Sequence, residues 1–172
     1  AQFGAANAFF IFSLAPLFAV LWTRLARRGW EPSTPVKFSL GIAQAGLGFG
    51  ALVYGAQFPD QAGLVSAWWL ILAYLLHTTG ELCLSPVGLS AVTKLAVPSV
   101  VGVMMGTWFL ASAYSSYVAA QIATIAARPA TEATLDRTGA LAGYTELFGQ
   151  LLTIGLAGGA VLIVLSPILK RL

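Results

Sequence analysis

Charged residues are scarce in this sequence. Asp, Glu, Lys and Arg make up 9% of the 172 residues, whereas hydrophobic residues make up 58% and the mean hydropathy is +0.84. Soluble domains carry about 25% charged residues, and a soluble fold of this composition would expose large apolar patches, which monomers rarely do. The composition therefore excludes an ordinary water-soluble domain and indicates a protein that resides in a lipid bilayer.

Cysteine and histidine are nearly absent as well. Cys83 and His77 are the single residues of their types, so no disulfide can form within the chain and no metal cluster can be assembled from them. Cys83 lies in an apolar run and is interpreted as a small buried residue. The opening Ala1-Gln2 lacks the basic segment of a signal peptide, and the missing initiator Met predicts a fragment of a longer polypeptide.

Long apolar runs dominate the sequence. A membrane-spanning helix needs about 20 mostly apolar residues, and five runs reach that length. Pro32, Pro35, Pro59 and Pro98 separate the first four runs, because proline lacks a backbone donor and breaks a helix. Residues 128–143 form the one long polar connection. The sequence therefore predicts an all-α, polytopic transmembrane bundle with spans at Ala6–Leu25, Phe38–Ala56, Ser66–Leu95, Val101–Ala126 and Ala142–Leu169.

Basic residues are distributed unevenly between the connections. Alternate connections and the C-terminal tail place seven Lys and Arg residues on one side of the bundle and two on the other. Cytoplasmic loops collect Lys and Arg, so we expect the N-terminal end to lie outside and the C-terminus in the cytoplasm. The seven are Arg24, Arg27, Arg28, Lys37, Lys94, Lys170 and Arg171, and the two are Arg128 and Arg137.

Glycines recur at a spacing of four in three of the predicted helices. A small residue at every fourth position lets the backbones of two membrane helices approach closely. The pattern predicts a closely packed bundle and favours no particular function. The pairs are Gly46 and Gly50, Gly102 and Gly106, and Gly155 and Gly159.

One acidic side chain lies deep in a predicted span. Glu81 is near the middle of 66–95, where a charge costs about 2.5–3.5 kcal/mol and persists beside a cavity or a partner. Tyr74, His77, Ser85 and Gly88 share its face, because they follow spacings of three or four. This polar stripe indicates a water-filled cavity, and the alternative is a hydrogen bond across a helix interface. We expect Glu81 to exchange a proton or bind an amine, with His77 either tuning it or acting as a hydrogen-bonded spacer.

Pro86 lies five residues after Glu81 on the same predicted helix. A helix that Pro or Gly interrupts at mid-depth often marks the binding site of a transporter. We therefore expect a kink at Pro86, which would let the end of this helix move separately during gating.

The run from Gly80 to Pro98, GELCLSPVGLSAVTKLAVP, closely resembles the tenth helix of the proton-dependent oligopeptide transporters, the POT/PTR family of the major facilitator superfamily. Residues 7–16, which contain NAFF and LAP, look like the eighth helix of that family, and 105–110 look like the eleventh. The family pattern ends in Lys-Leu-Ala-Pro, whereas Val97 precedes the proline here. The resemblance implies helices eight to twelve, a partial C-terminal six-helix half that occupies residues 1–172, with the N-terminal half outside this chain.

The resemblance also implies roles for single residues. Glu81 would bind the amino terminus of a peptide and take part in proton coupling, and Ser85 would line the same pocket. Asn7 would hydrogen-bond the peptide backbone, since an amide both donates and accepts. Trp108 and Phe109 would shape the pockets for the peptide side chains.

The function that the resemblance implies is proton-coupled import of di- and tripeptides by alternating access. It implies a multi-pass protein of the plasma membrane, with the bacterial inner membrane expected. Its partners would be the peptide, protons as the coupling ion, the lipid bilayer and the missing N-terminal half. No cofactor, metal or nucleic acid is expected.

Three alternatives differ in what they need from the sequence. A proton-coupled transporter of another small solute, such as nitrate or a drug-like compound, would use the same features. A passive channel predicts continuous polar faces on several helices, whereas one span has a clear one. An intramembrane enzyme is disfavoured, because His77 and Ser85 stand eight residues, about 12 Å, apart on one helix and no span contains an Asp.

Overall fold

The computed structural model describes residues 4–61, 64–132 and 137–170 of the chain. Within these residues it forms five α-helices, and a short 3₁₀ helix, η1 (Pro98–Val100), precedes the fourth. The described residues contain one isolated β-bridge, between Pro59 and Val65, and no longer strand. The all-α prediction is therefore confirmed. The helices are α1 (Gly4–Arg27), α2 (Thr34–Gly55), α3 (Ala67–Leu95), α4 (Val101–Glu132) and α5 (Arg137–Leu169).

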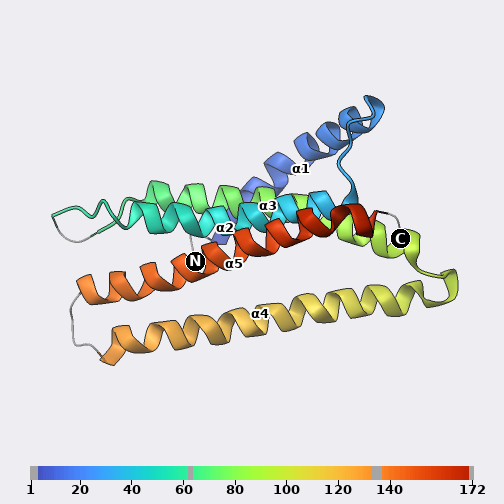
Figure 1. The fold of residues 1–172 in the computed structure, drawn as a ribbon. Coiled ribbons are helices and arrows are strands. Elements are labelled where there is room, and N and C mark those ends of the chain that lie inside the picture. Colours follow the sequence, from blue (N-terminus) through green and yellow to red (C-terminus); the bar gives the residue numbers. More distant parts are fainter. Residues whose placement is uncertain (1–3, 62–63, 133–136, 171–172) are drawn as a thin grey trace.

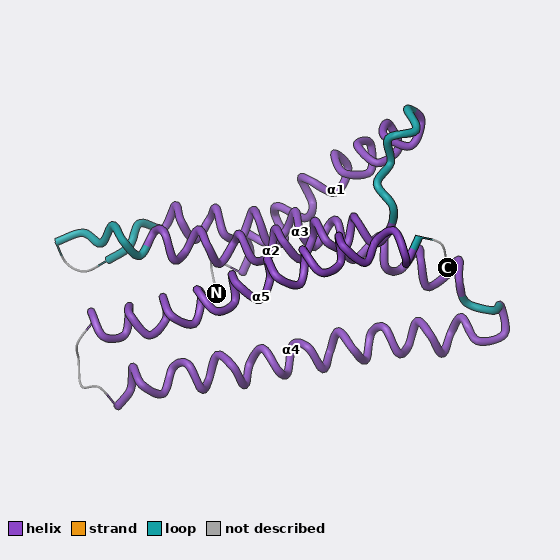
Figure 2. Tube along the Cα trace, viewed as in Figure 1, coloured by secondary structure: helices purple, strands orange, loops and turns teal. Residues whose placement is uncertain are grey.

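The helices form an elongated bundle in which α2 packs between α3 and α5. Figure 1 shows α1 crossing this group at an angle, whereas α4 runs along the outer side of α5. From α2 onward, successive helices run in opposite directions. The ends of α1, α3 and α5 therefore lie at the same end of the bundle as the starts of α2 and α4. Figure 2 shows that the described loops are confined to the two ends.

Four of the helices in the described residues are long and apolar enough to cross a membrane. They cover Ala5–Arg27, Thr34–Gly55, Ala67–Leu95 and Leu141–Leu169. The fourth helix in the chain, α4, is not among them, because it carries the more polar run ASAYSSY at 111–117. That α4 spans the bilayer remains a prediction.

Three helix boundaries differ by four or more residues from the sequence prediction. Helix α2 begins at Thr34, with Pro35 in its first turn, where the missing N–H of proline costs no hydrogen bond. Helices α4 and α5 extend to Glu132 and back to Arg137, so most of the predicted polar connection at 128–143 is helical. A hydropathy pattern locates only the part of a helix that crosses the hydrocarbon layer. The helix itself can continue beyond that layer into polar surroundings.

The end of α1 is set by a glycine. Gly29 has a φ of 70°, a left-handed conformation that residues with a Cβ seldom adopt. The N–H of Trp30 donates to the carbonyl of Leu25 at 2.9 Å, and the N–H of Gly29 donates to that of Ala26 at 3.0 Å. This is the Schellman pattern, which satisfies the last carbonyls of a helix and turns the chain toward α2.

One face of α2 carries glycines at a spacing of seven and packs on α3. A Cβ at Gly48 would collide with the ring of His77, and one at Gly55 would collide with Trp69. A Cβ at Gly80 of α3 would lie 2.6 Å from the carbonyl oxygen of Gly41. The α2–α3 interface therefore depends on glycine at Gly41, Gly48 and Gly55. The sequence prediction overlooked this spacing of seven residues.

The opposite face of α2 packs on α5 through the predicted small residues. A Cβ at Gly155 would lie 2.6 Å from the Cα of Gly46, so the two backbones are in contact there. The Ser39 hydroxyl, fully buried, donates to the carbonyl of Gly159 at 2.6 Å. Two of the predicted glycine pairs thus pack closely. Around the third pair, at 102 and 106 in α4, no described atom beyond the adjacent turns of α4 itself lies within 4 Å of an added Cβ.

Lys37 joins α1, α2 and the connection between them. Its ammonium lies 2.5 Å from a carboxylate oxygen of Glu31 and 4.6 Å from the ring centre of Trp22. The side chain is buried, at 7% exposure, which an ion pair and an aromatic face make tolerable. The sequence prediction placed Lys37 in a loop, whereas it lies in the first turn of α2.

Candidate functional site

The two sides of α3 have different surroundings. Gly80, Leu82 and Cys83 are buried, and the Sγ of Cys83 lies 3.8 Å from the Oε1 of Gln44 on α2. Glu81, between them in the sequence, is exposed. The packing of α3 on α2 therefore directs this carboxylate away from the glycine interface. The burial of Cys83 agrees with its prediction.

His77 borders the Glu81 face on the side of α2. Its Nε2–H donates to the carbonyl of Ala45 at 3.0 Å, since a carbonyl oxygen can only accept. The imidazole also lies against Phe49, with ring centres 4.6 Å apart. These contacts match the spacer alternative of the sequence prediction. A role of His77 in proton coupling stays a prediction.

Asn7 and Thr78 border the same face on the side of α1. The Thr78 hydroxyl, fully buried, lies 2.5 Å from Asn7 Oδ1 and 2.8 Å from the carbonyl of Tyr74. The hydroxyl positions the amide, and the described residues offer no recorded partner for its NH2 group, which can donate elsewhere. The sequence prediction missed Thr78. Its signal was a hydroxyl residue in a membrane helix, a type that often bonds across helices.

The aromatic pair of α4 behaves unequally. Trp108 is half-buried and lies over Gly88 of α3, where any Cβ would collide with the indole ring. Phe109 is 60% exposed. On α3, Ser85 is half-buried and lies between Glu81 and Gly88 in the sequence. Pro86 is exposed, and α3 continues through it without interruption. The structure thus places Asn7 of α1 and Trp108 of α4 against α3, the helix that carries Glu81 and Ser85. A gating motion at Pro86 stays a prediction.

These contacts define a strip along α3, formed by Thr78, Glu81, Ser85 and Gly88. At about 100° per residue, the four positions fall within a sector of about 80°, and at about 1.5 Å per residue they span about 15 Å. An extended peptide covers about 3.3–3.6 Å per residue. Thr78 is fully buried and Gly88 lies under Trp108. The accessible part of the strip therefore runs from Glu81 to Ser85, about 6 Å, which matches about two residues of an extended peptide. The strip offers one carboxylate, one amide and one aromatic wall along its length.

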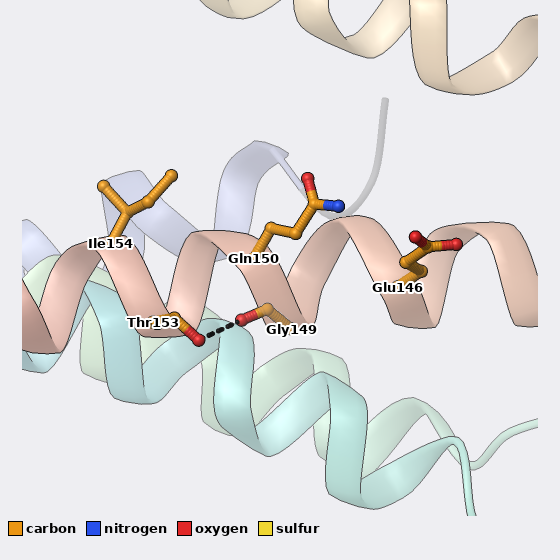
Figure 3. A pocket seen from close by; sticks show the side chains of 5 residues that line it. All are labelled: Glu146, Gly149, Gln150, Thr153 and Ile154. Atoms are coloured by element: carbon orange, nitrogen blue, oxygen red, sulfur yellow. Dashed lines mark hydrogen bonds between the residues drawn. The ribbon is translucent and has the colours of Figure 1, made fainter.

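A second group of polar residues lies on α5. Glu146, Gln150 and Thr153 line an open pocket of about 540 Å³ together with Gly149 and Ile154. Figure 3 shows Gln150 and Ile154 projecting from the side of α5 opposite the ribbon of α2, and Thr153 Oγ1 donates to the Gly149 carbonyl at 2.9 Å. Among the described residues there is no group of three His, Cys, Asp or Glu side chains that could hold a metal.

Comparison with protein families finds the model described as "PTR2: POT family", which matches residues 1–142. An uncharacterized transporter, YclF of Bacillus subtilis (strain 168), is 42% identical over 169 residues, which are 98% of this chain and 31% of that protein. Dipeptide and tripeptide permease B of Aliivibrio fischeri (strain MJ11) is 36% identical over 98% of this chain and 34% of the permease.

Solved structures give the same picture. A crystal structure of the peptide transporter POT in complex with sulfate matches 96% of this chain with a TM-score of 0.78 and 36% identity, over 30% of that transporter. A POT family transporter in complex with 5-aminolevulinic acid matches 94% of this chain with a TM-score of 0.77 and 29% identity. The chain spans about a third of the length of these proteins.

Proposed function

Because the chain belongs to the POT family, whose model matches residues 1–142, we propose that it supplies the peptide-binding helix of a proton-coupled peptide transporter. Its fold is part of a helical transporter fold of the major facilitator type. The family and its named relatives are transporters rather than enzymes. With several helices long enough to cross a membrane, the protein is a multi-pass membrane protein.

The observation that carries the proposal is the exposed Glu81 on α3. A charge in the middle of a membrane helix persists where it faces a cavity or a partner, and this one faces away from the packed interface with α2. The named relatives include dipeptide and tripeptide permeases. The α-ammonium of a peptide is the cation that such a carboxylate would bind by a charge-assisted hydrogen bond.

The neighbours of Glu81 supply the remaining contacts. The NH2 group of Asn7, held by Thr78, would donate to a peptide carbonyl. Ser85 lies one turn beyond Glu81 and would add a hydroxyl. Trp108 and Phe109 would form an apolar wall that accepts many side chains.

Glu81 can hold either a proton or the ammonium of a peptide. Protonated Glu81 lacks the charge that holds an ammonium, whereas ionised Glu81 attracts either a proton or the peptide. In a site that opens alternately to the two sides of the membrane, competition at this carboxylate alone would exchange a proton for a peptide. Import of both together therefore needs a second proton-binding group, which we place outside this chain, in the N-terminal half of the transporter. His77, one turn away, is the candidate for tuning this exchange.

The orientation of the chain is part of the proposal. Six of the seven basic residues assigned to the inner side are described, and they lie in or next to the helix ends that gather at one end of the bundle. Arg171 lies outside the described residues. We assign this end to the cytoplasm and the protein to a bacterial plasma membrane.

Dialanine uptake into proteoliposomes tests the proposal, with the full-length transporter that contains this chain. A proton gradient should drive accumulation, and an excess of dipeptide should compete, whereas nitrate and free amino acids should not. Glu81→Gln should reduce uptake roughly tenfold to a hundredfold, because a hydrogen bond to a charged group contributes about 1.5–3 kcal/mol.

Glu146→Gln is the matched control, because it removes the same charge from α5. It should retain uptake within about twofold of the unmodified transporter, given that exposed charges contribute little. Accumulation of dialanine against a gradient by the Glu81→Gln transporter would refute the coupling role. Competition by nitrate would favour transport of another small solute.

A further inference from the structure

The end of the bundle that carries the basic residues has a half-open cavity of about 660 Å³. Three helices contribute to its lining: the start of α2, the last turns of α3 and the end of α5. Figure 1 shows these three helix ends close to the C-terminus of the described chain. None of its lining residues belongs to the strip: those on α3 begin at Ala91, three positions after Gly88 and ten after Glu81.

One part of the lining is positively charged. Lys94 and Lys170 line the cavity from α3 and α5, and both side chains are exposed. No ion pair is recorded for either lysine among the residues the structure describes. No acidic residue is among the lining residues, and the nearby Glu31 is paired with Lys37.

The start of α2 adds to this positive character. Ser33 and Thr34 line the cavity, and the Ser33 side chain makes no capping hydrogen bond in the described structure. First-turn amides have no partner within their own helix, and the helix dipole favours an anion beside them. The two lysines also offset the dipoles at the C-terminal ends of α3 and α5, but that role does not require a cavity between them.

The other part of the lining is apolar. Ala91, Leu95 and Leu169 form it, with Leu95 83% exposed and Leu169 41% exposed. A free phosphate ion would make no use of this surface. An amphipathic anion would place its charge near the lysines and its hydrocarbon along the two leucines.

We propose that this cavity binds an anionic phospholipid, with the headgroup phosphate between Lys94, Lys170 and the start of α2 and an acyl chain along Leu95 and Leu169. Basic pockets between membrane helices on the cytoplasmic side suit such headgroups. Occupation of the cavity would join the ends of three helices. The lipid is thus a ligand distinct from the transported solute.

Native mass spectrometry of the full-length transporter tests the proposal by counting bound dioleoylphosphatidylglycerol against dioleoylphosphatidylcholine. The double variant Lys94→Gln/Lys170→Gln should bind phosphatidylglycerol about 30-fold more weakly, which corresponds to about 1 kcal/mol for each lysine. The control Arg24→Gln/Arg27→Gln removes the same charge from the exposed end of α1 and should change binding less than threefold. Circular dichroism melting shows whether each variant is folded.

A second variant and a competition experiment cover the other outcomes. Ala91→Phe keeps both lysines but places a phenyl ring in the cavity beside the proposed acyl chain, and it should also weaken binding of phosphatidylglycerol at least tenfold. Equal losses in the two double variants, or unchanged binding in Ala91→Phe, would overturn the proposal. Displacement of the lipid by millimolar inorganic phosphate would contradict the proposal and would indicate that the cavity binds a phosphate ion.

Discussion

The two sides of α3 show how one helix serves two purposes. On the side of α2, backbones meet across glycines, and His77, Trp69 and Leu84 fill the space that the missing side chains leave. On the other side, Glu81 is exposed, and Asn7 of α1 and Trp108 of α4 approach the helix at two levels. The first side holds the bundle together, and the second presents the groups that a peptide would contact.

The difference lies in what each side needs to be stable. Lipid gives little hydrophobic driving force between helices, so close backbone packing and buried hydrogen bonds stabilise the α2 interfaces. A binding side must leave polar groups free and still hold them in position. Fixing α3 firmly on α2 meets both needs, because it positions Glu81 without covering it.

The largest expected effect comes from adding one methyl group to the α2–α5 interface. Gly155→Ala would place a Cβ 2.6 Å from the Cα of Gly46, and overpacking of this kind costs about 1–3 kcal/mol. The melting temperature of the purified transporter should fall clearly. Gly149→Ala on the same helix is the control, since no described atom beyond the adjacent turns of α5 lies within 4 Å of its Cβ, and it should be neutral or stabilising. Equal effects of the two would show that close glycine contacts do not stabilise the interfaces of α2.

The next effect concerns a buried hydroxyl at the binding side. Thr78→Val keeps the shape of the side chain but releases Asn7 from its hydrogen bond. Hydrogen bonds between membrane helices contribute about 0.6–1.7 kcal/mol, so kcat/KM for dialanine should fall about threefold to fifteenfold. The kinetics of dialanine uptake into proteoliposomes measure this ratio. If Thr78→Val lowered the melting temperature and left kcat/KM unchanged, Thr78 would belong to the packed side.

The smallest effect concerns a buried hydroxyl of the α2–α5 interface, away from the exposed side of α3. Ser39→Ala removes the bond to the Gly159 carbonyl and should lower the stability by about 0.6 kcal/mol, the average for such bonds. Dialanine uptake should remain within experimental error of the unmodified transporter. A selective loss of uptake at normal stability would show that the two sides of the bundle are not separable in this way.

Much of the fold follows from the sequence, because the bilayer imposes a length on each helix. The third helix was expected at Ser66–Leu95 and is found at Ala67–Leu95. Where polar residues continue a helix beyond the apolar run, as in α4 and α5, hydropathy places its end too early. The spacing of seven between Gly41, Gly48 and Gly55 was visible in the sequence, but its partner helix depends on long-range packing.

The candidate site was predictable in its chemistry and less so in its surroundings. Glu81 stands out because a deep charge needs a reason, and the run from Gly80 to Pro98 led to the correct family. The residues of the polar stripe that contains Glu81 were expected to face the same surroundings, a water-filled cavity or a polar neighbour. Instead, His77 binds α2, Glu81 is exposed and Gly88 lies under Trp108. A helical repeat gives the direction of each side chain but not the neighbour that meets it.

Thiol labelling measures the difference between the two sides of α3 most directly. Cys83 is 3% exposed, and Ser85, two positions away, lies on the Glu81 strip. In a full-length transporter without other cysteines, Ser85→Cys in a Cys83→Ala background should react with a membrane-impermeant maleimide, and dialanine should slow that reaction. Native Cys83 alone should remain unlabelled. Labelling of Cys83 as fast as of the Ser85→Cys variant, or labelling of that variant unaffected by dialanine, would contradict a binding strip on the exposed side of α3.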